Sequence, residues 1–449
     1  MKINTLIAVL FAGISCFSQN TNLENLITQA QWNALFPKRA GTFGVHPQGY
    51  TTDFYSFNNL KQAADEMADY LVEIKVKDGV WGQLITITRK STNQTYIYSD
   101  VESWWHNNPT PETVVNVDFE HFVNRASDVN NKRELGAFLA NISKETTGGW
   151  QLPVGGGTDG DYATWGLYFV HEVGYTSANS AGAYSQAHPD YPPNPAVGYY
   201  GRGPIQLSWN YNYGQFSKFL YNDINVLLDN PDAIQNDGVL AFKSTIWFWM
   251  MPQCPKPSCH QVMHDLWVPE AGEYTADKMY KKGFAHTNNI INGGLECRTT
   301  STAAFTEKVV LRSELYKFYL GVMGLSQAQI ELEYTGDYTT LCYESTTVAM
   351  QDYLNCKVIE PVVVDPSSIS EYDNVQIMVY PNPTNSMLFV TLNESIEQIQ
   401  VLNATGQIIR SIQASGNQAE VNVSELSGGL YFIRVQSNNK SITRPFSVK

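Results

Sequence analysis

The chain has 449 residues, a formal net charge of −14, 16% charged residues and 12% aromatic residues. A chain of this length exceeds one average domain and can bury a sizeable core. The acidic balance argues against nucleic acids and anionic membranes as partners, because both carry negative charge. The aromatic content favours a carbohydrate-binding surface, since flat rings stack on sugar faces, although core packing also uses such residues.

Residues 1–19 have the pattern of a secretory signal peptide. Lys2 gives a positive start, and the short apolar stretch from Leu6 to Ile14 is followed by small and polar residues. No later apolar run is long enough to cross a bilayer. We therefore predict a protein that is exported through the periplasm and then either released or held at the cell surface.

Apart from Cys16 in that segment, the cysteines are odd in number. They are Cys254, Cys259, Cys297, Cys342 and Cys356. Export makes disulfides plausible, and an odd number leaves at least one thiol unpaired or intermolecular. Cys254 and Cys259 could close a small loop. The absence of a C-x-x-C pair argues against a zinc ribbon.

A short β-hairpin is predicted at residues 77–97. The run V-W-G-Q-L-I-T-I-T-R at 80–89 is rich in β-branched residues and partly alternates between apolar and polar positions. We expect this hairpin to be an insertion that lies away from the chemistry.

The stretch at residues 134–150 contains the first candidate catalytic residue. Four apolar residues recur at the spacing of an amphipathic helix: Leu135, Phe138, Leu139 and Ile142. The next position on that face is Glu145, and Gly148-Gly149 ends the helix. A poorly hydrated carboxyl group at the negative end of a helix dipole should have a raised pKa. This predicts a general acid, unless the last turn faces solvent and Glu145 is a surface residue.

A second carboxylate follows a glycine-rich loop at residues 155–160. The run W-G-L-Y-F-V-H-E begins at Trp165 and ends at Glu172. A glutamate in this setting is a candidate only together with other features, because most such residues lie on the surface.

The segment from Tyr199 to Gly214 is dense in Gly, Tyr and Asn. Its Gly and Pro residues predict an irregular, tightly turned backbone and argue against a helix. In an extended run, polar side chains at alternating positions would point the same way: Gln206, Ser208, Asn210 and Asn212. Uncharged hydrogen-bonding groups beside Tyr rings suit sugar hydroxyl and N-acetyl groups, although a hydrogen-bonded turn would explain part of the pattern.

Residues 242–251 are apolar on every side and predict a helix buried in the core, ended by Pro252. His260 and His264 then have the i, i+4 spacing of a helical metal pair. The glutamate of H-E-x-x-H is missing and no third ligand is evident, so we predict no metal.

A linker is predicted at residues 357–373, where Pro and Ser occur without helical periodicity. Residues 374–449 consist of short strand-like runs separated by turns, which predicts a small β-sandwich. A carbohydrate-binding module is the alternative from the pattern alone. Residues 370–449 contain no Trp, which counts against that alternative.

Two long motifs resemble the family 19 glycoside hydrolases, the plant-type chitinases. They are K-E-T-T-G-G-W at 144–150 and Y-Y-G-R-G-P-I-Q-L-S-W-N-Y-N-Y-G at 199–214, in the same order as in the family. Residues 26–39 resemble the family's first helix, and residues 287–297 resemble a further block. The resemblance implies a mainly α, two-lobed, lysozyme-like catalytic domain at residues 20–356. It implies endo-hydrolysis of the β-1,4 bonds of chitin without a cofactor.

The resemblance also implies roles for particular residues. Glu145 would be the general acid and Glu172 the general base for a water held by Ser208, with inversion at the anomeric carbon. Substrate contacts would come from Gln206, Tyr211, Asn212, Lys256, Asn292 and Trp165. Glu296 and Arg312 would form a network that keeps Glu172 ionised, and Cys297 would pair with Cys342. Lys144 replaces the family's usual His, and we expect it to point to solvent, because adjacent helix residues do not face each other.

The runs P-N-P-T at 381–384 and G-L-Y-F-I-R-V at 429–435 resemble the C-terminal sorting domain of the type IX secretion system in Bacteroidetes. The sequence thus predicts a monomeric secreted endo-chitinase whose partners are chitin or chitooligosaccharides and the type IX machinery. The alternatives are a peptidoglycan hydrolase and a non-catalytic glycan-binding surface protein. The presence of both carboxylates and Ser208 argues against the non-catalytic alternative.

Overall fold

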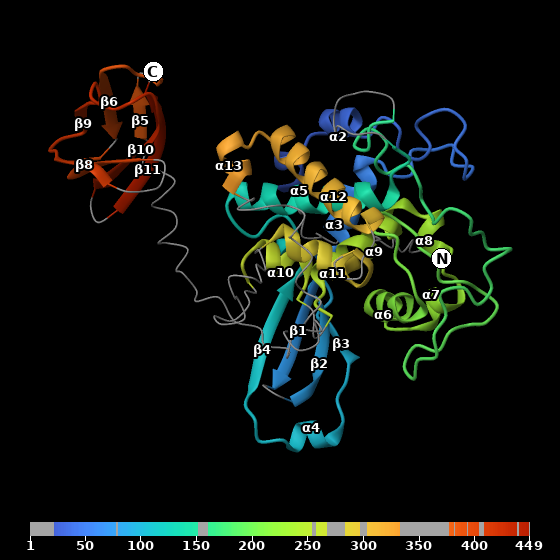
Figure 1. The fold of residues 1–449 in the computed structure, drawn as a ribbon. Helices are drawn as coiled ribbons and strands as arrows, with labels where there is room; N and C mark the ends of the chain where they lie inside the picture. Colours follow the sequence, from blue (N-terminus) through green and yellow to red (C-terminus); the bar gives the residue numbers. More distant parts are fainter. Residues whose placement is uncertain are drawn as a thin grey trace, which may run out of the picture. The chain divides into compact units, whose positions relative to one another are not determined.

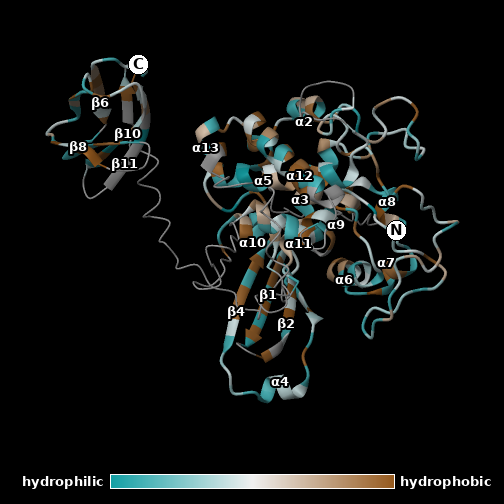
Figure 2. Ribbon diagram, viewed as in Figure 1, coloured by the Kyte–Doolittle hydropathy of each residue, from teal (hydrophilic) through white to brown (hydrophobic). Residues whose placement is uncertain are grey.

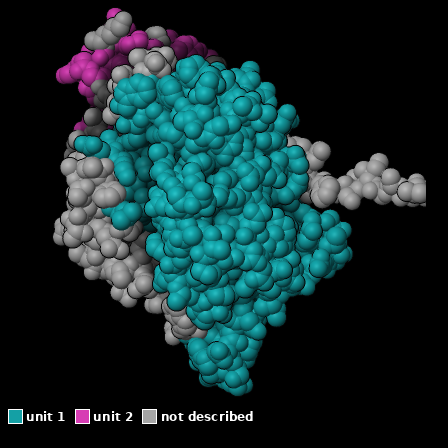
Figure 3. Space-filling view, turned by 90° about the vertical axis from the view of Figure 1, so that its right-hand side faces the viewer, with its two compact units in different colours: residues 1–360 teal, residues 361–449 magenta. Residues whose placement is uncertain are grey.

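The computed structural model describes residues 22–77, 80–150, 160–253, 257–266, 283–296, 303–332, 377–380, 382–392, 394–403, 408–437 and 440–448. The chain divides into two units, Met1–Glu360 and Pro361–Lys449, which Figure 3 colours separately. Among the described helices, none combines the length and the apolar character that crossing a membrane requires. Several predictions concern residues outside these ranges: the signal peptide at 1–19, the linker at 357–373, and Lys256, Cys254, Cys297, Cys342 and Cys356.

The first unit is built mainly of helices with one sheet between the third and fifth of them (Figure 1). Its elements in chain order are α1 (Asn22–Leu26), α2 (Gln29–Leu35), α3 (Phe57–Met67), β1 (Tyr70–Lys77), β2 (Val80–Arg89), β3 (Gln94–Ser99), α4 (Ser103–Asn107), β4 (Glu112–Asp118), the short 3-10 helix η1 (Phe119–His121), α5 (Asp128–Thr146), α6 (Asn210–Tyr221), α7 (Asn225–Asp229), α8 (Ala233–Asn236), α9 (Gly238–Met250), α10 (Cys259–Met263), α11 (Phe284–Glu296), α12 (Ala303–Val322) and α13 (Gln327–Leu332).

Helix α5 lies at the centre of this unit and carries Glu145 near its end. The Ser127 side chain caps its first turn by accepting a hydrogen bond from the Asn130 N–H. The predicted apolar face is fully buried, and α5 packs closely against α12. Gly136 permits this approach, because a Cβ there would lie 2.9 Å from the Leu320 side chain. The predicted helix is therefore confirmed, and its burial fixes where Glu145 lies.

The predicted hairpin is the pair β2–β3, in which Thr88 lies opposite Thr95. It belongs to a larger antiparallel sheet of order β3-β2-β1-β4, which was not predicted. Strand β1 alternates between buried and partly exposed residues, and its buried Val72 and Ile74 join the main core. Figure 2 shows hydrophobic residues recurring along these strands, and Figure 1 shows α4 at the end of the sheet farthest from α10 and α11.

The predicted core helix is confirmed as α9, whose residues are mostly buried. Its N-cap Asp237 accepts hydrogen bonds from the Val239 and Leu240 N–H groups. Pro252 follows two residues after the helix ends at Met250, at a position where Pro cannot continue a helix.

The second unit contains two antiparallel sheets with a shared hydrophobic core. Its strands are β5 (Ile377–Tyr380), β6 (Met387–Leu392), β7 (Gln398–Leu402), β8 (Ile408–Gln413), β9 (Gln418–Asn422), β10 (Gly429–Ser437) and β11 (Lys440–Val448). The sheet orders are β11-β10-β7-β8 and β5-β6-β9. Leu388 and Val390 of one sheet and Ile399 and Ile433 of the other are fully buried in the same cluster. This cluster is separate from the core of the first unit.

Candidate active site

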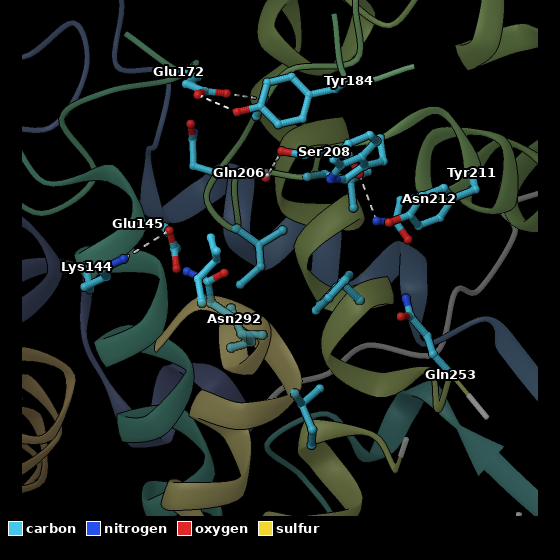
Figure 4. A pocket seen from close by; sticks show the side chains of 18 of the residues that line it. Lys144, Glu145, Glu172, Tyr184, Gln206, Ser208, Tyr211, Asn212, Gln253 and Asn292 are labelled. Atoms are coloured by element: carbon cyan, nitrogen blue, oxygen red, sulfur yellow. Dashed lines mark hydrogen bonds and ion pairs between the residues drawn. The ribbon is translucent and has the colours of Figure 1, made fainter. Parts of the chain in front are cut away.

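A cleft of about 610 Å³ in the first unit is lined by both predicted catalytic carboxylates, Glu145 and Glu172 (Figure 4). They project into it from different elements, α5 and the irregular segment after residue 160. Other predicted residues that line the cleft are Gln206, Ser208, Tyr211, Asn212 and Asn292. A concave site with a few convergent polar groups is the usual form of a small-ligand or sugar site.

Glu145 lies in a strongly charged environment, and its side chain is only 15% exposed. Its carboxylate pairs with the Arg312 guanidinium, which comes from α12, and its Oε2 lies 3.6 Å from the Lys144 Nζ. Burial raises the pKa of Glu145, but the positive charges of Arg312 and Lys144 outweigh burial and lower it below its ordinary value. The predicted raised pKa is thus wrong for the free site, because the helix that carries Glu145 does not reveal the Arg312 charge on α12.

The guanidinium of Arg312 is fully buried and organises this side of the cleft. Its Nε donates to Glu296 Oε2 at 2.9 Å, and its Nη1 donates to Asn141 Oδ1 at 2.8 Å. Burial raises the pKa of Glu296, but the charge of Arg312 beside it brings the pKa down to about 2. The predicted partnership of Arg312 and Glu296 is present. Arg312 also pairs with Glu145, so this network directly contacts the predicted acid.

Lys144 also belongs to this charged group, and the prediction that it points to solvent is wrong. Its side chain is 10% exposed, and its Nζ donates to Glu296 Oε1 at 3.0 Å. Burial, followed by the nearby charge of Arg312, lowers the pKa of Lys144. The rule that adjacent helix residues face apart fails here, because the long lysine stem lets its ammonium group reach a carboxylate on α11.

Asn292 sits at a break inside α11, with φ −143° and ψ 25°. Its Nδ2 donates to Glu296 Oε1 at 2.8 Å, and the residue lines the cleft. The break therefore brings an amide group to the edge of the charged cluster, where it faces the cleft.

Glu172 has neutral partners instead. Its Oε1 accepts a hydrogen bond from the Tyr184 hydroxyl at 2.7 Å, and its Oε2 accepts one from the Gly201 N–H at 3.2 Å. Burial, followed by the neighbouring Glu172 carboxylate, raises the pKa of Tyr184, so this hydroxyl stays a donor. Sequence reasoning missed Tyr184, because it lies in the irregular region between Glu172 and α6 and carries no motif.

The segment at residues 199–214 is irregular up to Trp209, as predicted, but it then enters a helix, which was not predicted. Helix α6 begins at Asn210, and Trp209 before it has a positive φ of 75°. The buried Asn210 donates to the Gln186 and Tyr191 carbonyls, so it is a structural residue. Gln206, Ser208 and Asn212 line the same cleft, whereas Asn210 does not, so the predicted common direction is wrong for Asn210 alone.

Ser208 and Gln206 still lie on the cleft. The Ser208 Oγ donates to the Gln206 carbonyl at 3.0 Å. The Gln206 side chain donates to the carbonyls of Gly203, at 2.8 Å, and Val170, at 3.3 Å. In this structure the Gln206 amide nitrogen thus supports the backbone around Glu172.

Two amide side chains on the cleft have an atom with no protein partner among the described residues. The Asn212 Oδ1 and the Gln253 Nε2 are buried and lack a hydrogen bond there, while the Asn212 Nδ2 donates to the Ser208 carbonyl at 2.8 Å. A buried polar atom without a partner is costly unless a ligand or water completes it. Gln253 was not predicted, and its only sequence signal is its place beside the end of α9.

The predicted Trp165 is not among the residues that line this cleft. Its ring packs against Tyr168 at 4.8 Å between centroids, Trp150 at 5.7 Å and Phe43 at 6.0 Å. Trp150 is 58% exposed and Phe43 is 45% exposed. Trp165, Tyr168, Trp150 and Phe43 form an aromatic surface of their own on the first unit.

Among the described residues, Glu134, His260 and His264 have ligand atoms within 4.8 Å of one another, as a metal site would require. Each oxygen of the Glu134 carboxylate, however, already accepts two N–H groups. These are Trp249 Nε1 at 3.0 Å and His260 Nδ1 at 2.7 Å on Oε1, and Val123 N and His264 Nε2, both at 2.8 Å, on Oε2. A carboxylate whose acceptor positions are filled by donors holds together the segments that supply those donors. The i, i+4 histidines therefore bind Glu134 and have a structural role.

Residues 112–331 match the family model described as chitinase class I, and residues 378–449 match the model described as secretion system C-terminal sorting domain. Endochitinase A2 of Pisum sativum is 41% identical over 207 residues, which are 46% of this chain and 58% of that protein. Endochitinase 3 of Solanum tuberosum is 44% identical over 195 residues, which are 43% of this chain and 55% of that protein. The chain thus spans less than two thirds of the length of these relatives.

Two solved structures are also similar. Chitinase C from Streptomyces griseus HUT6037 has 23% sequence identity and a TM-score of 0.39, over 67% of this chain and 78% of that chain. A class IV chitinase from Zea mays has 26% identity and a TM-score of 0.32, over 46% of this chain and 77% of that chain.

Proposed function

Since this chain belongs to the chitinase class I family, glycoside hydrolase family 19, and carries a secretion-system C-terminal sorting domain, we propose that it is an exported endo-chitinase. It cleaves the β-1,4 bonds between N-acetylglucosamine units in a single inverting displacement. The observation that carries this proposal is the pair of carboxylates on one cleft, Glu145 among charges and Glu172 among neutral donors. Two carboxyl groups from different elements that meet at one cleft suit the acid and base pair of a glycosidase.

In the proposed reaction, Glu145 donates its proton to the glycosidic oxygen as the bond to the anomeric carbon breaks. Glu172 accepts a proton from a water that attacks the same carbon from the opposite face. Ser208 anchors that water: its hydroxyl hydrogen is directed at the Gln206 carbonyl, so its oxygen is left to accept a hydrogen bond.

Glu145 has to gain a proton before each turnover. An oligosaccharide that fills the cleft removes water from around Glu145, and the loss of hydration favours the neutral carboxyl group. The charges of Arg312 and Lys144 oppose this change, so they determine how readily Glu145 is protonated.

The proposed substrate contacts begin with the two buried polar atoms that have no hydrogen-bond partner among the described residues. The Asn212 Oδ1 and the Gln253 Nε2 are an acceptor and a donor suited to the amide of an N-acetyl group. Tyr211 and Asn292 line the same cleft. Trp165, in the aromatic surface with Trp150, and Lys256 are proposed as contacts for more distant sugar units.

The product anomer tests the mechanism. An inverting enzyme acting on β-linked oligomers releases the α-anomer first, which proton NMR reads in the first minutes before mutarotation. An early excess of β-anomer would overturn the two-glutamate, one-water mechanism. Peptidoglycan is assayed in parallel. If the protein released fragments from peptidoglycan but left chitin oligomers uncleaved, it would be a peptidoglycan hydrolase and not a chitinase.

The sorting domain is tested separately. A chain that ends at residue 364 lacks nearly all of the second unit, which begins at Pro361, and should hydrolyse chitin oligomers normally, because both carboxylates lie in the first unit. In a host with a type IX secretion system it should stay in the periplasm, whereas the full chain leaves the cell. An inactive but folded truncation would show that the second unit takes part in catalysis.

A further inference from the structure

The backbone that leads directly to Glu172 is bound along its length by residues 40–55. The contacts are Ala40 N to Leu167 O at 2.9 Å, His46 Nε2 to Tyr168 O at 2.7 Å, Tyr55 Oη to Phe169 O at 3.3 Å, Val170 N to Gln48 Oε1 at 2.8 Å, and Gln48 Nε2 to His171 O at 2.5 Å. Successive peptide groups from 167 to 171 are therefore each held by a residue more than one hundred positions earlier in the chain.

We propose that Ala40, His46, Gln48 and Tyr55 form a base clamp, which positions Glu172 for catalysis. The inference rests on the proposed function, in which Glu172 is the general base. None of the four touches the reacting atoms, so they act through the backbone on which Glu172 sits. The base clamp precedes residues 112–331, the part of the chain that matches the chitinase model.

The segment needs outside support, because it forms no helix or strand of its own. Its regular pairing is an isolated bridge between His171 and Arg202. Leu167 is fully buried with a positive φ of 57°, a strained conformation for a branched residue. Strained backbone persists only where its surroundings determine it, and buried peptide groups must find hydrogen bonds. The base clamp supplies both.

Gln48 is the central member, because its amide group contacts two successive residues. One end accepts from the Val170 N–H and the other donates to the His171 carbonyl, so the side chain fixes position as well as orientation. On the other side, Gly203 N donates to Val170 O at 2.8 Å and Glu172 N donates to Gly201 O at 2.9 Å. Glu172 is thus held between the base clamp and the irregular segment that continues from Gly201 to Ser208.

The base clamp is itself braced. Arg39 and Asp53 form a two-pronged ion pair across its ends, with Nε to Oδ1 at 2.7 Å and Nη2 to Oδ2 at 2.6 Å. The Phe54 N–H donates to the Ala40 carbonyl at 3.1 Å. A loop closed in this way presents its side chains in a fixed arrangement before any substrate binds.

The first test replaces Gln48 with Ala and compares kcat and KM on N-acetylglucosamine oligomers. We expect kcat to fall about 10- to 100-fold, because a small misplacement of a catalytic group has effects of this size. KM should stay within about twofold, since the substrate contacts lie elsewhere. Gln62→Ala is the matched control: Gln62 is exposed on α3 and donates to Glu66 at 2.8 Å, so its loss should leave kcat unchanged.

Azide separates a displaced base from a damaged fold. The small anion attacks the anomeric carbon directly, the glycosidic C–O bond breaks, and the Glu145 proton goes to the leaving oxygen, so no base is needed. We expect azide to accelerate Glu172→Ala strongly and Gln48→Ala in part, with formation of a glycosyl azide, and to leave the wild type unaffected.

The outcomes of these tests are distinguishable. Wild-type activity in Glu172→Ala would remove the proposed function itself. A Glu172→Ala variant that is inactive and rescued by azide, beside a Gln48→Ala variant with normal kcat, would overturn the base clamp alone. If Gln48→Ala fails to fold, Gln48→Glu replaces it. This variant keeps the acceptor for Val170 but not the donor to His171, and a normal kcat in it would also overturn the base clamp.

Discussion

The two carboxylates of the cleft are held in opposite ways. Glu145 ends a buried helix and is surrounded by ions: Arg312, Lys144 and Glu296 all lie within the same cluster. Glu172 sits on irregular backbone and is held by neutral donors, the Tyr184 hydroxyl and the Gly201 N–H. We call the surroundings of Glu145 the charged side of the cleft and those of Glu172 the neutral side. The protonation of Glu145 depends on the number and sign of the charges around it, whereas the position of Glu172 depends on its backbone.

This difference suits the two proposed tasks. An acid must change its protonation state in every cycle, and nearby charges set the free energy of that change. A base must hold a water at the right distance and angle, which depends on geometry. Substitutions on the charged side should therefore alter stability and pH dependence, and substitutions on the neutral side should alter kcat.

The largest effect is expected from Arg312→Leu. It leaves Glu145 and Glu296 buried without their main counter-charge, and breaking a buried ion pair in this way costs about 3–5 kcal/mol of unfolding free energy. Lys132→Ala on the same α5 is the control. Its partner Asp128, at 2.7 Å, is exposed, so this i, i+4 pair should contribute about 0.5 kcal/mol or less. Urea unfolding measures both free energies, and equal losses in the two variants would mean that Arg312 contributes no more than a surface ion pair.

The charged side should also dominate the response to acid. The pKa of Glu296 is about 2 in the folded chain, against an ordinary value of 4.5. Because the folded pKa is the lower one, this stabilisation is complete above about pH 4.5 and is lost as the pH falls towards 2. The loss is on the order of 3 kcal/mol.

Unfolding free energies from pH 5 to 2 check this for the wild type and Glu296→Gln. The wild type should lose more stability over that interval, because Gln carries no titrating group. Parallel curves would show that Glu296 is not held in its ionised form.

Glu145→Gln should lower the rate on chitin oligomers by at least about 10²-fold while binding is retained, because general acid catalysis contributes at least that much. The loss should be smaller on a nitrophenyl glycoside, whose leaving group departs without a proton. Glu172→Gln should lose similar rates on both substrates, since the attacking water needs a base in either case. If Glu145→Gln lost equal rates on both substrates, Glu145 would have no role in leaving-group protonation.

Local patterns in the sequence predicted much of the helix and cleft framework. The apolar spacing around Glu145 depends only on neighbouring turns, so α5 could be read directly. The two long motifs carry Glu145 and Ser208, and the run that begins at Trp165 carries Glu172; all three residues line the same cleft.

What the sequence did not predict depends on contacts between distant residues. Arg312 reaches Glu145 across 167 positions, and this contact reverses the expected direction of the pKa shift. Gln48 reaches His171 across 123 positions. Neither residue stands in a local pattern that reveals its partner, since a buried polar side chain is defined by what packs around it. The same holds for Glu134, whose two histidines come from α10 and the residue after it.

The smallest effect, and the finest test of the charged side, is expected from Lys144→Gln. A general acid acts in its protonated form, so activity falls as the pH rises through the pKa of Glu145. The Lys144 ammonium group lies 3.6 Å from Glu145 Oε2 and favours the ionised carboxylate, together with Arg312 and against the repulsion from Glu296. Removing it should move the alkaline limb of kcat/KM to higher pH while the rate at the optimum changes little.

Lys144→Arg, which keeps the charge, should leave that limb in place, and pH profiles of the three proteins on one oligomer measure it. An alkaline limb of kcat/KM that is unchanged in Lys144→Gln would mean that substrate binding separates Lys144 from Glu145. In that case the charge that opposes protonation of Glu145 would come from Arg312 alone.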